Sequence, residues 1–234
     1  MTRVAIMQPT YLPWCGYFGL IAAVDVFIFL DSVQFAKRSW QQRNQIKTAR
    51  GGHWLTVPVD SKGRSEQLIS EVKIDKKSNF SSKHVKSIEV NYAKAVHFKD
   101  FGPDLFELIN RPYSHLVDMN VEIIKHCLKV LNINTEVIYS SQMHGVGVKA
   151  DLLASLCKEV CATEYISAPG SKNYLETSVA FKEIGVPVSY FNYVHPEYPQ
   201  LFGDFLPYIS FIDMLLNCGD RSSDLILSGI KSEV

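Results

Sequence analysis

The sequence lacks the features that mark several large classes of protein. Its 24 Lys and Arg residues balance 24 Asp and Glu residues, so no overall basic charge is present to attract nucleic acid. Its five cysteines are odd in number and scattered, which favours reduced thiols over a disulfide framework. The most apolar run, residues 18–30, contains Asp25 and is too short to cross a bilayer. Because no secretory signal pattern precedes the first apolar segment, we expect a cytoplasmic protein.

Sequence motifs for metals and phosphates are also scarce. Cys157 and Cys161 are four residues apart on an expected helix, but no nearby Cys or His completes a tetrahedral site, so we expect no metal. Residues 167–174 close an expected strand and open a helix, yet they match neither the Walker A pattern nor the GxGxxG fingerprint. Their small residues still let a ligand approach the backbone. We therefore expect this segment to line a crevice, with Tyr174 as a binding residue.

Apolar segments of strand-like composition recur along the 234 residues and alternate with helical patterns. The expected strands cover residues 4–7, 26–30, 54–59, 72–74, 135–139, 165–168 and 186–191. The expected helices cover residues 16–24, 118–131, 149–161, 174–184 and 206–218. This alternation predicts an α/β protein with a mainly parallel sheet flanked by helices, a Rossmann-like fold. We expect a single α/β domain over residues 1–234, with a less regular insertion or subdomain at about residues 60–100.

The opening turn, residues 8–15, is the most informative segment of the chain. It joins the first expected strand to the first expected helix, which is where open parallel α/β folds bind ligands. Two prolines stiffen the turn. Its side chains offer hydrogen bonds and stacking surface, unlike the short polar turn that a mere connector would use. The candidate binding residues here are Gln8, Thr10, Tyr11 and Trp14.

Two residues at the carboxyl ends of expected strands are candidates for catalysis. Asp31 follows the second strand, where a carboxylate can orient a hydroxyl, an amine or a metal; the alternative is an Asx-type turn cap. His195 follows the last strand and is the first choice for a general base, with a structural histidine as the alternative. Cys15, near a helix start, is either a nucleophile or a packing residue, and we favour packing. Tyr198 and Gln200, which follow His195, are candidate binding residues.

A local basic run lies at residues 37–50, with a tryptophan and several amides among the cations. Arg presents a planar fork and Lys a point charge, so such a run can bind a phosphate or diphosphate. The alternative is a solvated basic surface, but Trp40 among amides favours binding. Arg43 and Lys47 share one face if the segment is helical. The candidate binding residues in this run are Lys37, Arg43, Asn44 and Lys47, and Gln34 shortly before it is a further candidate.

Several motifs together resemble the WbqC-like family. They are the opening QPTYLPW-x-GYF, D-x-VQF at residues 31–35, R-N-x-I-K at 43–47, WLTVPV at 54–59, HPEYPQ at 195–200 and S-x-IDML-x-N-x-G at 210–219. They span nearly the whole chain. The opening turn is also reminiscent of nucleotidylyltransferases, but it lacks both histidines of their HxGH-type signature. The fold analogy therefore implies no adenylyl transfer by that signature.

The resemblance implies a role in bacterial O-antigen or lipopolysaccharide biosynthesis. The leading hypothesis is a transferase that adds an acyl or aminoacyl group, such as glycyl, to an amino sugar that is nucleotide-linked. The donor is open between an adenylate made from ATP, a thioester on a carrier protein and an aminoacyl-tRNA. One alternative is a nucleotide-binding ligase or nucleotidylyltransferase relative. The other is a binding or scaffold protein of a polysaccharide assembly complex, without catalysis.

Overall fold

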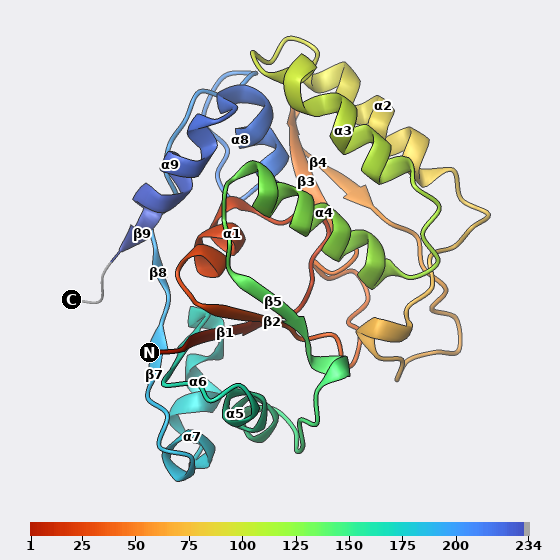
Figure 1. The fold of residues 1–234 in the computed structure, drawn as a ribbon. Helices are drawn as coiled ribbons and strands as arrows, with labels where there is room; N and C mark the ends of the chain where they lie inside the picture. The colour runs from red at the N-terminus through yellow and green to blue at the C-terminus, as the bar shows by residue number, and fades with distance from the viewer. Residues whose placement is uncertain (232–234) are drawn as a thin grey trace.

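A five-stranded parallel sheet forms the centre of the protein, in a computed structural model that describes residues 1–231 (Figure 1). Its strand order is β5-β2-β1-β6-β7. The strands are β1 Arg3–Met7, β2 Val26–Phe29, β5 Glu136–Tyr139, β6 Glu164–Ser167 and β7 Val188–Tyr190. Each lies within two residues of an expected strand. The expected α/β architecture with a mainly parallel sheet flanked by helices is confirmed.

The side chains of the two central strands alternate between two hydrophobic cores. Val26 and Ile28 of β2 pack on one side of the sheet, and Phe27 and Phe29 pack on the other. β1 alternates in the same way, as the two-residue period of a strand requires. Because both faces are buried, these strands are apolar throughout, which is typical of parallel sheets covered by helices.

Helices cover both faces of the sheet (Figure 1). One core receives side chains from α1 Cys15–Ala22, α4 Leu116–Val130, α8 Phe211–Cys218 and α9 Arg221–Gly229. The other receives them from α5 Ala150–Glu159, α6 Lys172–Glu176 and α7 Ala180–Glu183. The last two replace the single helix expected at 174–184, and the break between them covers residues 177–179. Two of these residues, Thr177 and Val179, are β-branched, which slightly disfavours a helix. The expected helix at 206–218 starts only at Phe211, after Pro207 and the N-cap Ser210.

The middle of the chain adds a hairpin and two helices to the first core. These elements are β3 Arg43–Thr48, β4 Gly51–Thr56, α2 Phe80–Tyr92 and α3 Phe98–Asn110. The condition that Arg43 and Lys47 share a helical face is not met, because both lie on β3. The strand expected at 54–59 is part of the antiparallel hairpin and ends at Thr56. The strand expected at 72–74 is wrong: Val72 and Ile74 are buried in a loop that forms only isolated bridges.

The remaining elements are short. They are the 3₁₀ turns η1 Ile69–Glu71, η2 Ser140–Gln142 and η3 Pro169–Ser171, and the strands β8 Asn192–Tyr193 and β9 Ile230–Lys231. Within residues 1–231, no helix combines the length and the apolar character needed to span a membrane.

The strand order creates a crevice beside β1. The chain builds β1, β2 and β5 in one direction across the sheet and then places β6 and β7 on the other side of β1. The connection after β1 therefore runs toward β2, and the connection after β6 runs the opposite way, toward β7. Ligands of open parallel sheets bind at such a switch point.

Candidate functional site

Two cavities adjoin at the carboxyl edge of the sheet, where β1 and β6 end. The first has a volume of about 260 Å³ and the second of about 300 Å³. Both linings include Met7, Thr10 and Trp40, so the cavities share a wall. Pockets of this kind at a switch point are the usual ligand sites of the fold.

The wall of the first cavity is mostly apolar and includes several uncharged polar side chains. Gln8 follows β1, while Ser167, Ser171 and Tyr174 come from the end of β6 and the segment after it. The amide of Gln41 donates a 2.7 Å hydrogen bond to Oε1 of Gln8. This bond orients the Gln8 amide and leaves its Nε2 as a donor for a ligand.

Aromatic rings dominate the second cavity. Trp14, Tyr17, Trp40 and Tyr208 line it, together with the buried Asn44. Tyr208 comes from the far end of the chain, brought there by an antiparallel bridge between residues 14 and 210. Its ring lies 5.4 Å from the Trp14 ring. It also has a φ of 61°, a strained value for a non-glycine residue of the kind found at functional sites.

Neither cavity is charged: no described residue in either lining is Asp, Glu, Lys, Arg or His. Such walls suit sugar hydroxyls, amides and aromatic or aliphatic groups better than a bare anion. Within residues 1–231, no group of three or more His, Cys, Asp or Glu side chains is arranged to hold a metal ion.

A cysteine and a histidine meet behind the aromatic wall. Sγ of Cys15 lies 3.3 Å from Nε2 of His195. Nδ1 of His195 lies 2.9 Å from the Pro196 carbonyl and donates to it, so Nε2 is the acceptor and the thiol the donor. The imidazole stacks on Trp14 at 6.0 Å and meets Tyr208 at 5.2 Å. His195 therefore contacts two rings of the second cavity without lining it.

Both members of this pair are uncharged at neutral pH. Burial raises the pKa of the Cys15 thiol to about 11. Burial also lowers the pKa of His195, against the hydrogen bond to the Pro196 backbone. A thiol and an imidazole, rather than a thiolate and an imidazolium, are the stable forms.

A protein-family model described as the WbqC-like protein family matches residues 8–224, from Gln8 of the first cavity into α9. The chain belongs to the WbqC-like protein family. It is also 38% identical over 228 residues to "Uncharacterized protein Rv1507c" of Mycobacterium tuberculosis (strain ATCC 25618 / H37Rv), covering 97% of this chain and 98% of that protein. No solved structure matches the chain. The resemblance inferred from the motifs is thus confirmed.

The residues expected to bind or react divide into two groups in this WbqC-like protein. Five of them line the cavities: Gln8, Thr10, Trp14, Asn44 and Tyr174. The others lie outside both linings: Tyr11, Asp31, Gln34, Lys37, Arg43, Lys47, His195, Tyr198 and Gln200. Tyr17, Ser39, Gln41 and Tyr208 also line the cavities and were not among the expected residues. Two of them carried a sequence signal, Tyr17 in the opening motif and Gln41 among the amides around Trp40.

Asp31 follows β2 and bonds to residues that follow the neighbouring strand β5. Its Oδ1 accepts hydrogen bonds of 3.0 Å from the Ser140 hydroxyl and 2.8 Å from the Ser141 backbone, and its Oδ2 accepts one of 2.6 Å from the Ser141 hydroxyl. The carboxylate is 2% exposed. These partners lie 109 and 110 residues further along the chain, so the carboxylate joins the ends of two neighbouring strands. The structure does not bring Asp31 together with His195 at either cavity.

The basic run does not gather at a single site. Lys37 Nζ donates to the Ser61 carbonyl at 2.8 Å. Lys47 is buried, and its Nζ donates to Gln200 Oε1 at 3.0 Å and to carbonyls of residues 203 and 204. These two lysines organise loops of the WbqC-like fold, while the Arg43 guanidinium lies over Trp54 instead.

Three further residues belong to the interior: the candidate binding residues Tyr11 and Tyr198, and Asp213 of the motif at 210–219. The fully buried Tyr11 has its hydroxyl 2.8 Å from Nδ1 of His84. Asp213, between two apolar helix residues, accepts a 2.7 Å hydrogen bond from the Tyr92 hydroxyl, which supplies the partner that a buried carboxylate needs. Tyr198 is 7% exposed and receives a hydrogen bond of 3.1 Å from Gln200. Gln34 binds the Ser65 carbonyl at the surface.

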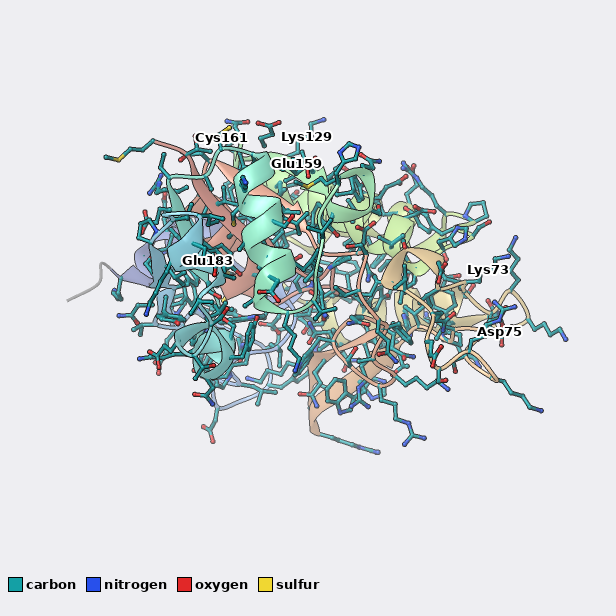
Figure 2. The ribbon with its side chains drawn as sticks, turned by 90° about the horizontal axis from the view of Figure 1, so that it is seen from below. Lys73, Asp75, Lys129, Glu159, Cys161 and Glu183 are labelled. Carbon is teal, nitrogen blue, oxygen red and sulfur yellow. The ribbon has the colours of Figure 1, made fainter. Side chains whose placement is uncertain are left out.

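Alkylation should distinguish a packed Cys15 from an activated one. We expect iodoacetamide to modify Cys161 quickly and Cys15 slowly at pH 7.5, because the reactive form is the thiolate and Cys15 is buried with a raised pKa. Cys161 is exposed and lies at the edge of the molecule near Glu159 (Figure 2). Mass spectrometry of peptides from briefly labelled native protein measures both rates. Faster labelling of Cys15 would instead indicate a thiolate held by a His195 imidazolium.

Proposed function

We propose that this protein is a transferase that moves an acyl or aminoacyl group onto the amine of an amino sugar in surface polysaccharide biosynthesis. The observation that carries the proposal is the pair of adjoining cavities that share Met7, Thr10 and Trp40. Group transfer requires two substrates held next to each other, and such a shared wall provides that proximity. The role that the family resemblance implies is consistent with this arrangement.

The two linings favour different substrates. The first cavity offers hydroxyl and amide groups, which can pair with the hydroxyls of a sugar ring, and Trp40 offers a face for its C–H groups. The second offers mainly aromatic rings, which suit the apolar or aromatic part of an acyl donor. We assign the amino sugar to the first cavity and the activated donor to the second.

The reaction needs a free amine and a proton acceptor. The amine nitrogen attacks the carbonyl carbon of the donor, a C–N bond forms, and the bond to the donor's leaving group breaks. The attacking nitrogen then loses a proton. Neither nitrogen of His195 is open to the cavities, because Nδ1 donates to the Pro196 carbonyl and Nε2 accepts from Cys15. We therefore propose that the donor's leaving group takes up this proton.

Mass spectrometry tests the proposal directly. The protein is incubated with ATP, a pool of amino acids, acyl thioesters and a set of nucleotide-linked amino sugars. A sugar product heavier by one acyl or aminoacyl unit, absent with heat-denatured protein, is expected. Pyrophosphate release without that product would favour the ligase alternative. No product, together with thermal stabilisation by a sugar alone, would favour a binding role, since a ligand at about 100 times its Kd adds roughly 2.7 kcal/mol.

Substitutions in the linings should separate the two substrates. Trp40→Leu is expected to raise the KM for both by about tenfold, because the indole lines both cavities and its stacking is worth about 1.4 kcal/mol. Tyr174→Leu should affect only the sugar, and Tyr208→Leu only the donor. Steady-state kinetics with each substrate varied in turn measures these effects. Equal effects of the two tyrosine variants on both substrates would contradict the assignment.

A further inference from the structure

All three tryptophans of the chain lie along one path that starts in the cavities. Trp14 lines the second cavity, and Trp40 lines both. Trp54, on β4, has its ring 5.4 Å from the Trp40 ring. Trp40 is 51% exposed and Trp54 is 38% exposed. Large aromatic side chains left exposed next to each other at a cleft are typical of binding surfaces.

The Arg43 guanidinium completes this path. Its Cζ lies 4.3 Å from the centroid of the Trp54 ring. Arg43 pairs with Thr56 and Gln45 with Trp54 in the hairpin, so Arg43 and Trp54 are diagonal neighbours on one face of the two strands. The pairing of β3 with β4 holds the cation next to the aromatic surface.

The polar edge of Arg43 has no partner within the described chain. Lys37 and Lys47 use their amines on backbone carbonyls and on Gln200, whereas the Arg43 side chain forms neither a hydrogen bond nor an ion pair in residues 1–231. Stacking on Trp54 occupies a face of the guanidinium but not its in-plane N–H donors. A planar group with several unused donors matches phosphate oxygens.

Because neither cavity lining is charged, a phosphate-bearing ligand would need a cation from outside the cavities. A nucleotide-linked sugar carries two phosphates, and neither lining offers a charge to balance them. We propose that Arg43, Trp54 and Trp40 form an outer subsite that binds the diphosphate end of a nucleotide-linked sugar. Arg43 holds the phosphate oxygens, and the indole faces stack on the nucleoside. This inference rests on the proposed function, because the sugar end then lies in the first cavity.

Titration with nucleoside diphosphates tests the subsite without any turnover. ADP, GDP, CDP, UDP and dTDP are titrated separately, each beside its uncharged nucleoside, at fixed ionic strength. Quenching of tryptophan fluorescence reports binding, because every indole of the chain lies on the path. We expect at least one diphosphate to bind about tenfold more tightly than its nucleoside, the gain of one charge-assisted contact.

Two arginine variants locate the contact. Arg43→Gln should weaken binding of that diphosphate by about tenfold and leave the nucleoside unchanged. Arg50→Gln is the matched control: Arg50 is exposed in the turn between β3 and β4, and the change removes the same charge. It should leave binding within about twofold. If Arg43→Gln does not fold, as judged by thermal unfolding, Arg43→Lys replaces it and should show a smaller loss, because the charge remains but the fork is lost.

Three results would overturn the subsite. They are unchanged diphosphate binding in the Arg43 variant, equal losses in the Arg50 control, and no binding of any diphosphate at millimolar concentration. Failure of the transferase proposal gives a different pattern, since diphosphate binding that depends on Arg43 would persist without an acyl product. Conversely, acylation of an amino sugar without diphosphate binding would keep the transferase and exclude the subsite.

Discussion

Replacing Gly16 with alanine is expected to weaken ligand binding in the second cavity by at least about tenfold while the protein still folds. Gly16 lies in the first turn of α1, directly beneath the Trp14 indole. A Cβ at this position would lie 2.1 Å from Cη2 and 2.4 Å from Cζ2 of that ring. The indole must therefore leave its place, where it lines the cavity and contacts His195 and Tyr208.

The expected stability of this variant is a balance of two effects. Alanine is better than glycine inside a helix by about 1 kcal/mol, which opposes the loss of packing around the displaced Trp14. Gly102→Ala in α3 is the matched control, because its new Cβ would meet nothing closer than 3.6 Å. The control should be stabilised by up to about 1 kcal/mol and bind ligand normally.

Thermal unfolding and ligand titration of both glycine variants separate the outcomes. The donor is the informative ligand, because Trp14 lines only the second cavity. Normal donor binding by the Gly16 variant would mean that Trp14 can move without consequence. That result would remove this indole from the site.

The central sheet was predictable because its strands carry their own signal. Residues 26–29 read VFIF, a run that a buried parallel strand requires and that local sequence alone identifies. β3 carries no such signal, since it reads RNQIKT. Its residues bond to partners that are far away in the sequence. The Lys47 backbone N–H donates to the Tyr92 hydroxyl, and the Lys47 amine donates to groups in residues 200–204. A pattern read along the sequence contains no information on such contacts.

Five lining residues were expected: Asn44 and Tyr174 from separate segments, and three from one continuous stretch of the sequence. Gln8, Thr10 and Trp14 follow one strand, so the rule for strand ends identified them together. The pairing of Cys15 with His195 joins residues 180 positions apart, and sequence gives no distance between them. Asp31 and Lys47 show the opposite difficulty, since a buried polar residue with structural partners looks the same in sequence as one that awaits a ligand.

Acidification is expected to destabilise the fold through His84. This side chain is 6% exposed on α2, and its Nδ1 accepts a hydrogen bond from the Tyr11 hydroxyl. Burial lowers the pKa of His84 from 6.5 to about 4, against a hydrogen bond with the Thr56 backbone. Burial also raises the pKa of Tyr11, so the phenol keeps its proton and remains the donor. A proton on Nδ1 would turn this acceptor into a donor, so the hydrogen bond would reverse and the Tyr11 hydroxyl proton would need a new acceptor in a buried site.

Because folding lowers the pKa of His84, acid destabilises the folded state. Above pH 6.5 the imidazole is neutral in both the folded and the unfolded chain, so the full stability is present. As the pH falls from 6.5 to about 4, only the unfolded chain takes up the proton, and stability is lost. A shift of this size corresponds to about 3 kcal/mol over that range.

Urea unfolding of His84→Gln beside the wild type at pH 7, 6, 5 and 4 measures this contribution. The glutamine variant should be less stable than the wild type at pH 7. The difference between their unfolding free energies should become smaller by about 3 kcal/mol by pH 4, because only the wild type has a buried imidazole to protonate. Other groups titrate in both proteins and cancel in the difference.

Parallel stability curves for wild type and His84→Gln would show that His84 does not titrate in this way. If the difference becomes smaller as expected, the effect should extend to the cavities. Tyr11 follows Thr10 of the shared wall, and its backbone N–H donates a 3.0 Å hydrogen bond to the carbonyl of Trp40, another residue of that wall. As the pH is lowered, ligand affinity should then fall with the same midpoint as the protonation of folded His84.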